Sequence, residues 1–192
     1  MVEIIRQYIN RISKIFSTKE ATEHSYRGEF KNLCEGVLNG ASSKSIGYSD
    51  FQNKKAERYT LINEPKRKTY GAPDYELLKG DTAIAFIEAK NIGDSDLKGT
   101  NVRKHKEQFD RYKNAISTIA FTDYLSIFLY ENGEETLSAQ LGYVKDGIVV
   151  ITDDKQQFVN FEKIMQRLGK AEPQPIRSAS TLADKMARKA KQ

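Results

Sequence analysis

The sequence is poor in the features that mark secreted and membrane proteins. Cys34 is the only cysteine, which excludes an internal disulfide, and it falls on the apolar face of a predicted helix, where a small core residue is expected. No apolar run approaches the ~20 residues that a membrane-spanning helix needs. Glu3, Arg6 and Arg11 interrupt the N-terminal apolar positions, so the unbroken run of ~7–15 apolar residues of a secretory signal is missing. We therefore expect a cytoplasmic protein that is not inserted in a membrane.

The motifs of several large enzyme classes are also absent. The sequence contains no Walker A phosphate loop, no glycine pattern of a Rossmann dinucleotide site and no Gly-x-Ser-x-Gly elbow of a serine hydrolase. His24 and His105 are the only histidines, and two histidines with one cysteine do not make a credible zinc site. These absences argue against an ATP site, a nicotinamide site and a structural zinc in this chain.

What the sequence does contain is an excess of basic residues. Lysine and arginine number 31 against 26 aspartates and glutamates, which gives a net charge of +5 and an isoelectric point near 9.1. A basic balance favours a polyanionic partner. Part of the excess lies in the C-terminal tail, so the folded part is less basic than the total; these tail residues include Lys185, Arg188, Lys189 and Lys191.

Hydrophobic periodicity places helices before and after a group of strands. Apolar residues at helical spacing indicate the helices, and short apolar or alternating runs bounded by turn residues indicate the strands. The run 83–87 is apolar on both faces, which is typical of a central strand. We therefore expect an α/β fold with a central mixed sheet flanked by helices. The predicted helices cover residues 2–16, 25–38, 102–117 and 158–168. The predicted strands cover 59–63, 74–78, 83–89, 119–122 and 125–130, with a further strand pair or one broken strand at 143–152.

A segment with two prolines, residues 172–175, marks the predicted end of the folded domain. We place that domain at residues 1–170, with an N-terminal helix within residues 1–18. The last stretch, residues 180–192, is a basic helical segment with no apolar partner nearby in the sequence. We expect residues 171–192 to form a linker and the start of a helical connector to domains absent from this chain.

Three charged residues stand where two of the predicted strands meet. Asp74 opens one strand and Glu88 closes the next, so the turn between the strands brings both carboxylates to one edge of the sheet. Glu88 and Lys90 are two positions apart on a strand and therefore leave the same face. Two carboxylates suit a hard cation such as Mg²⁺, which prefers oxygen ligands and keeps several waters. The pattern predicts metal-assisted phosphodiester cleavage, and the alternative is a pair of strands that end in solvated charges.

Several motifs resemble those of the RecB-like branch of the PD-(D/E)xK nucleases. More narrowly, the segments 22–27, 63–67, 71–75 and 87–90 resemble the N-terminal nuclease domain of single-chain type ISP and type IIL restriction–modification enzymes. The similarity runs from about residue 20 to about residue 130. The motifs occur in the expected order, as Gly71-x-x-Asp74, Glu88-x-Lys90 and Gln108-x-x-x-Tyr112.

The resemblance implies a restriction-endonuclease-like fold with its nuclease core at residues 20–130, and a role for each matched position. Asp74 and Glu88 would bind Mg²⁺, for which Mn²⁺ substitutes, and Lys90 would be the charged catalytic residue. Gln108 and Tyr112 lie four apart on one helical face, from which they would contact the DNA or steady Lys90.

The resemblance also implies a substrate and partners. Enzymes of this class hydrolyse double-stranded DNA and leave a 5′-phosphate. Specificity would come from methyltransferase and target-recognition domains of the same polypeptide, with a helicase-like ATPase in the type ISP enzymes. Because one site cuts one strand, a double-strand break would require two copies, which implies dimerisation.

Further residues are candidates for supporting roles. PD-(D/E)xK nucleases often add a carboxylate from the preceding helix, and we assign that role to Glu29, which sits at the edge of the apolar stripe, with Glu23 as the rival and Glu35 as a weaker choice. Basic residues near the predicted site are expected to contact the phosphate backbone, with solvated loops as the alternative. These residues are Lys66, Arg67, Lys68 and Lys104.

The sequence thus predicts a Mg²⁺-dependent DNA endonuclease domain whose specificity comes from other domains. One alternative is a catalytically silent DNA-binding or scaffolding module with the same fold. Another is a junction resolvase or an exonuclease on that fold. Closed circular DNA separates these enzymes from an endonuclease, because a resolvase needs branches and an exonuclease needs ends.

Overall fold

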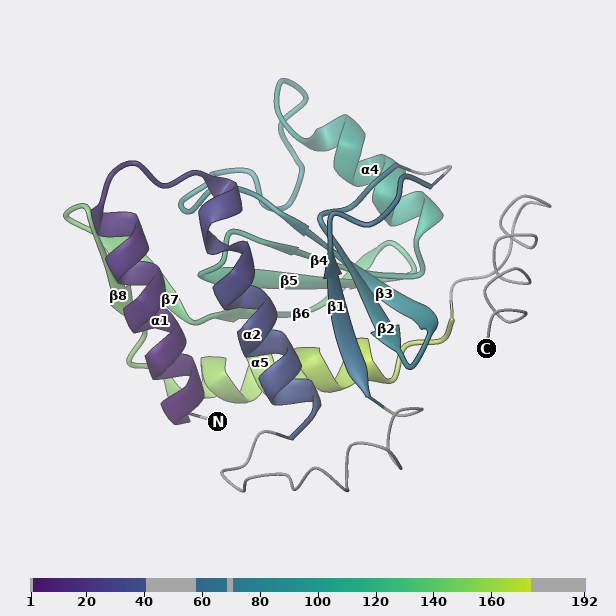
Figure 1. Ribbon diagram of the computed structural model, residues 1–192. Helices are drawn as coiled ribbons and strands as arrows, with labels where there is room; N and C mark the ends of the chain where they lie inside the picture. Colours follow the sequence, from purple (N-terminus) through teal and green to yellow (C-terminus); the bar gives the residue numbers. More distant parts are fainter. Residues whose placement is uncertain (1, 41–57, 69–70, 174–192) are drawn as a thin grey trace.

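The computed structural model describes residues 2–40, 58–68 and 71–173, which form a six-stranded sheet with helices on both faces and a separate antiparallel pair of strands, β7 and β8 (Figure 1). The strand order follows the sequence from β1 to β6, and β3 and β4 are parallel while every other neighbouring pair is antiparallel. The predicted α/β architecture with a mixed sheet is therefore confirmed. The helices are α1 (Val2–Ser17), the 3₁₀ helix η1 (Glu23–Tyr26), α2 (Arg27–Leu38), α4 (Lys106–Ala115) and α5 (Lys155–Gly169), and the strands are β1 (Tyr59–Asn63), β2 (Tyr75–Lys79), β3 (Thr82–Ala89), β4 (Thr118–Thr122), β5 (Ser126–Glu131), β6 (Glu134–Gln140), β7 (Gly142–Lys145) and β8 (Ile148–Ile151).

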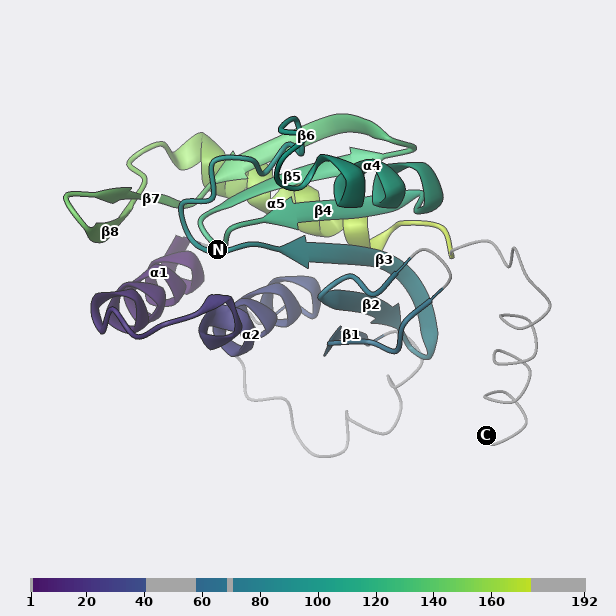
Figure 2. The same cartoon turned by 90° about the horizontal axis from the view of Figure 1, so that it is seen from above.

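The central strand β3 is buried on both of its faces. Ile87 belongs to the larger hydrophobic core, which α1, α2 and α5 share, whereas Phe86 belongs to a smaller core formed with α4. Figure 2 shows α1 and α2 on one side of β3 and α4 on the other. This arrangement confirms the central position that the apolar run predicted. Successive residues of β3 therefore pack into two separate hydrophobic cores.

Helix α4 is held on the sheet by stacked aromatic rings. Phe109 lies against Phe121 with ring centroids 4.0 Å apart, and Phe121 meets Tyr130 edge-on. The loop before the helix approaches this stack closely, because a Cβ added at Gly99 would lie 2.6 Å from Phe109, and Gly99 has a positive φ of 63°. The stack fixes α4 beside the end of β3.

Two predictions about secondary structure were wrong. The helix expected over 102–117 begins only at Lys106, because the Asp96 carboxylate accepts the backbone N–H groups of Thr100 and Asn101 and holds the preceding residues in turns. Strand β6 was missed altogether, because its residues are mostly polar and exposed at the edge of the sheet. The turn before it, Asn132 and Gly133, has positive φ at both positions, as a tight hairpin requires.

Some predictions fall outside the described residues. The predicted basic helix at 180–192 is among them. The domain limits at 170 and 171 therefore stay predictions. Across residues 2–40, 58–68 and 71–173, no helix has the length and apolar character needed to cross a membrane.

Replacement of Phe109 by alanine tests the role of the aromatic stack. Phe109 is fully buried, so its removal should lower the free energy of unfolding by about 3–5 kcal/mol through lost contacts and a residual cavity. Urea denaturation measures this loss. Val102→Ala, at a position that is 79% exposed, is the control and should change the free energy little. A loss below about 1 kcal/mol for Phe109→Ala would show that α4 is held by other contacts.

Candidate active site

The three residues singled out in the sequence come together where β3 ends. Asp74 directly precedes β2, whose first residue pairs with Ile87 of β3. The Asp74 Oδ2 accepts the backbone N–H of Ala89 at 2.8 Å. Lys90 follows β3, and its backbone N–H donates to the carbonyl of Thr122 at the end of the parallel strand β4, at 2.8 Å. The site thus lies at the edge where β3 and β4 both end.

The Glu88 carboxylate is the most buried charged group of this site, with 3% of the residue exposed. Its Oε1 accepts two hydrogen bonds, from Lys90 Nζ at 2.6 Å and from Gln108 Nε2 at 2.7 Å. Its Oε2 is buried and has no hydrogen-bond partner. Burial and the nearby Asp74 carboxylate raise the pKa of Glu88 to about 7, although Lys90 opposes the shift. One oxygen of a buried acid therefore accepts no hydrogen bond from the described residues.

Helix α4 completes this side of the site. Gln108 reaches Glu88 from the helix, and Lys90 Nζ lies 5.6 Å from the centre of the Phe109 ring. Tyr112, one turn further along, is almost fully buried and packs against Gly71, where an added Cβ would lie 2.9 Å from its ring. The structure thus places Gln108 on Glu88 and Tyr112 in the packing between α4 and the loop before Asp74.

A residue with no predicted role, Arg27, lies on the other side of Asp74. Its guanidinium bonds to the Asp74 carboxylate, to Glu23 at 3.0 Å and to Glu64 at 2.5 Å. The segments 22–27 and 63–67 supported the family resemblance, but no sequence pattern indicated that they are in contact. Their juxtaposition depends on the packing of α2 against β1 and on the hydrogen bond from Glu64 N to the Asp74 carbonyl.

The donor set fits a divalent cation that takes few protein ligands. Four carboxylates (Glu23, Glu64, Asp74 and Glu88) face two basic groups (Arg27 and Lys90), so two negative charges remain when all are ionised. The unpartnered Glu88 Oε2 is a free oxygen ligand. Among the described residues no three histidine, cysteine or acidic side chains are grouped as a complete metal cage. Mg²⁺ suits such a site, because it binds one or two carboxylates and fills the rest with water and phosphate oxygens.

The helix carboxylates occupy different places from those expected. Glu29 pairs with Arg11 of α1 at 3.1 Å, since the edge of α2 on which it lies faces α1. Glu35 accepts the backbone N–H of Leu61 at 2.7 Å. Glu23, the rival candidate, lies beside Asp74 through its bond to Arg27. A supporting carboxylate at Glu29 would require the Arg11 pair to break.

The candidate phosphate-binding residues divide into free and engaged ones. Lys66 and Arg67 are exposed on the loop that follows Glu64. Lys68 is half-buried and pairs with Glu76 at 3.3 Å. Lys104 donates to the Ser95 hydroxyl at 2.9 Å. Two aspartates hold the loop that carries Ser95 in place. Asp94 is hydrogen-bonded to His105, and Asp96 accepts backbone N–H groups.

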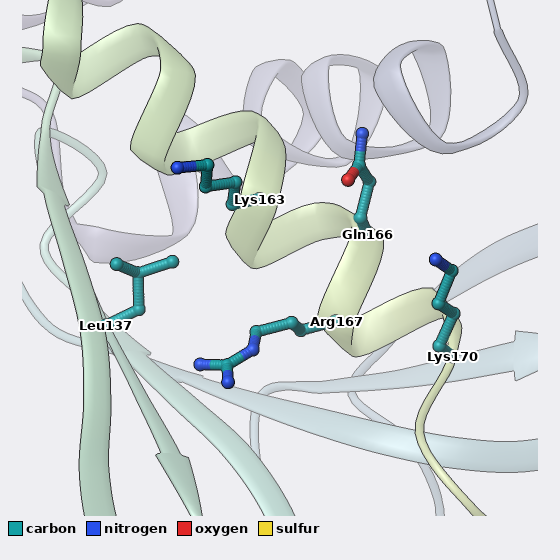
Figure 3. Close-up of a pocket in the computed structure, with 5 residues that line it drawn as sticks. All are labelled: Leu137, Lys163, Gln166, Arg167 and Lys170. Atoms are coloured by element: carbon teal, nitrogen blue, oxygen red, sulfur yellow. The ribbon is translucent and has the colours of Figure 1, made fainter.

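A basic hollow of about 350 Å³ lies elsewhere, between α5 and the edge strand β6 (Figure 3). Because α5 packs on the face of the sheet opposite α4, this hollow is separate from the acidic centre around Glu88. Arg167 is held there by an ion pair with Glu131 at 3.3 Å. The residues that line the hollow are Leu137, Lys163, Gln166, Arg167 and Lys170.

Comparison with known proteins gives a structural likeness without a sequence family. No protein-family model matches the chain, and no curated protein matches it. A solved structure that it resembles is a chain of the cryo-EM structure of a DrdV–DNA complex, with a TM-score of 0.56 and 18% sequence identity over 90% of this chain. The present chain spans 14% of the length of that one. At this identity the likeness shows a shared fold.

The buried Glu88 should make stability depend on pH. The folded protein binds this proton more tightly than the unfolded chain, so the free energy of unfolding falls as the pH rises from about 4.5 to about 7. Glu88→Gln removes the titrating group, and its free energy of unfolding should fall less than that of the wild type over this window, by up to about 3 kcal/mol.

Urea denaturation at several pH values, with a chelator present, measures the difference. Glu134→Gln removes an exposed carboxylate from β6 and serves as the control. If wild type and Glu88→Gln show parallel pH profiles, the Glu88 carboxylate does not carry a raised pKa.

Proposed function

We propose that this chain is a Mg²⁺-dependent DNA endonuclease domain of the PD-(D/E)xK class, with Asp74, Glu88 and Lys90 at its catalytic centre. The observation that carries the proposal is the convergence of these three side chains at one sheet edge, with Glu88 Oε2 buried and unpartnered. Buried polar atoms are nearly always partnered, so this oxygen calls for a partner such as a water molecule or a cation. The fold shared with part of a DrdV chain is consistent with this reading.

The proposed reaction adds one water across a phosphodiester bond. The water oxygen bonds to phosphorus, the bond from phosphorus to the 3′ oxygen breaks, and that oxygen takes up a proton. Mg²⁺ would lower the pKa of a bound water and offset negative charge on the phosphate. Asp74 and Glu88 would hold the ion, and Lys90 would place its ammonium group against the water or the phosphate. Gln108 would keep the Glu88 carboxylate in one orientation.

DNA is the proposed substrate for two reasons. The structural neighbour is part of a complex with DNA. In addition, Lys66 and Arg67 are exposed on the loop that joins Glu64 to the segment before Asp74, so they could bind the phosphate backbone next to the site. Such contacts add affinity that is independent of sequence and sensitive to salt.

We further propose a restriction–modification context on the basis of the sequence resemblance. Residues 1–170 would be the nuclease domain and residues 171–192 a connector to methyltransferase, target-recognition and helicase-like domains of a longer polypeptide. Sequence specificity would lie in those domains. Two copies would act together on double-stranded DNA.

Plasmid nicking tests the proposed activity. With Mg²⁺ or Mn²⁺ the full chain should convert supercoiled plasmid to the open circular form, and a chelator should stop the reaction. Asp74→Ala and Lys90→Ala should each lower the nicking rate at least about a hundredfold, because the first removes a proposed metal ligand and the second a charge placed against the water or the phosphate.

Arg6→Ala is the matched control, because it removes an exposed arginine from α1 that has no assigned role in the site. Circular dichroism should show that all variants are folded. Salt-sensitive DNA binding without any nicking at high protein concentration would favour a silent binding module. Cleavage of linear or branched DNA alone would favour an exonuclease or a resolvase.

A charge-matched pair of variants tests the DNA contact. Lys66→Ala/Arg67→Ala should weaken binding to a labelled duplex and reduce the slope of log K against log salt by about 2, because two phosphate contacts are lost. Lys163→Ala/Arg167→Ala removes the same charge from the basic hollow of Figure 3 and should have a smaller effect. Fluorescence anisotropy at several salt concentrations measures both. A larger effect of the second pair would place the DNA on the α5 face.

A further inference from the structure

Arg27 is buried at the point where three carboxylates meet. Only 8% of its side chain is exposed, and the guanidinium bonds to Asp74, to Glu23 and to Glu64. Glu23 and Asp74 are themselves largely covered, with 21% and 16% of their side chains exposed. A guanidinium is always charged and offers donors in a fixed fork, so this residue contributes a permanent positive charge to the acidic centre.

The fold commits several elements to this contact. Glu23 and Arg27 are four residues apart, across the junction of η1 and α2. Glu64 has a positive φ of 48° and donates its backbone N–H to the Asp74 carbonyl at 2.8 Å. The start of α2 and the turn after β1 are thus both bonded to Asp74, the residue that directly precedes β2. Arg27 forms an ion pair with Asp74, whereas Lys90 forms one with Glu88.

We propose that Arg27 is the resident counter-cation of the site, a positioning residue that holds Asp74 when no metal is bound and opposes the binding of a divalent cation there. This inference rests on the proposed function, since it requires a metal at Asp74. Its physical basis is Coulomb repulsion between the guanidinium and a cation that shares the same carboxylate. That repulsion is larger in a covered site than in water.

Opposition at Asp74 has a direct consequence for metal affinity. The Asp74 Oδ1 is engaged by Arg27 and the Oδ2 by Ala89 N–H, so an entering cation must share oxygens that already have partners. Removing the guanidinium charge frees Asp74 and raises the net negative charge of the site by one. Both changes favour a divalent cation and disfavour the metal-free protein.

Calorimetric titration of the full chain with Mn²⁺, in the absence of DNA, tests the inference. Arg27→Met should bind Mn²⁺ about tenfold more tightly than the wild type, because the repelling charge is gone. Arg27→Lys retains a positive charge and should remain within about threefold of the wild type. Arg6→Met removes an exposed arginine from α1 and should leave the affinity unchanged.

A second measurement distinguishes opposition of Arg27 to metal binding from a purely structural role of this residue. The melting temperature should fall in Arg27→Met without metal, and saturating Mn²⁺ should raise it by more than in the wild type. If Arg27 served only packing, the two proteins would show the same increase. Should the methionine variant fail to fold, Arg27→Gln, which keeps hydrogen-bond donors but not the charge, carries the same expectations.

Weaker or unchanged Mn²⁺ binding in the neutral variants overturns the inference. Asp74→Asn distinguishes this from failure of the proposed function. If Asp74→Asn abolishes Mn²⁺ binding while Arg27→Met leaves it unchanged, the metal site stands and only the role of Arg27 is lost. If Asp74→Asn leaves Mn²⁺ binding intact, both proposals fail.

Discussion

The burial of the Glu88 carboxylate is the constraint on which the rest of the site depends. A charged group that is removed from water must find hydrogen bonds, opposite charge or a cation, or else hold its proton. Lys90 and Gln108 satisfy one oxygen of Glu88, and the other has no partner. The aromatic stack that fixes α4 matters for this reason, because α4 supplies Gln108 and covers Lys90. The electrostatics of the site therefore depend on the packing of the smaller core.

Asp74 raises the same problem from the opposite side. Its negative charge contributes to the raised pKa of Glu88, and its own carboxylate is paired with Arg27. The larger core positions this residue, because Tyr26 and Phe30 are buried on either side of it in the chain. Arg27 thus reaches Asp74 from the side of the larger core, while Lys90, which follows β3, lies against Phe109 of the smaller core. β2 and β3 lie between them and bring the two pairs together.

The sequence was a good guide to the sheet and to the residues that meet at its edge. The run 83–87 predicted a central strand because both faces are apolar, and Asp74, Glu88 and Lys90 are placed by strand geometry alone. It failed at β6, whose polar residues carry no alternation, and at the start of α4, which a carboxylate delays. It could not find Arg27, because the contact joins residues 27, 64 and 74, and only tertiary packing brings them together. Glu29 pairs with Arg11 for the same reason, since helical spacing identifies a face but not its neighbour.

The polar edge strand β6 limits how two copies of this domain can approach each other. An open edge offers unpaired backbone groups, and a second copy could extend the sheet by pairing there. Glu134 and Glu135 stand at the start of β6, and α5 packs along this strand. Such an edge disfavours strand pairing between two copies, because pairing would bury the carboxylates of β6 in the interface. Helix α5 also covers part of the surface that a second strand would need. If two copies act together, as proposed above, their contact would use a surface other than this end of the sheet.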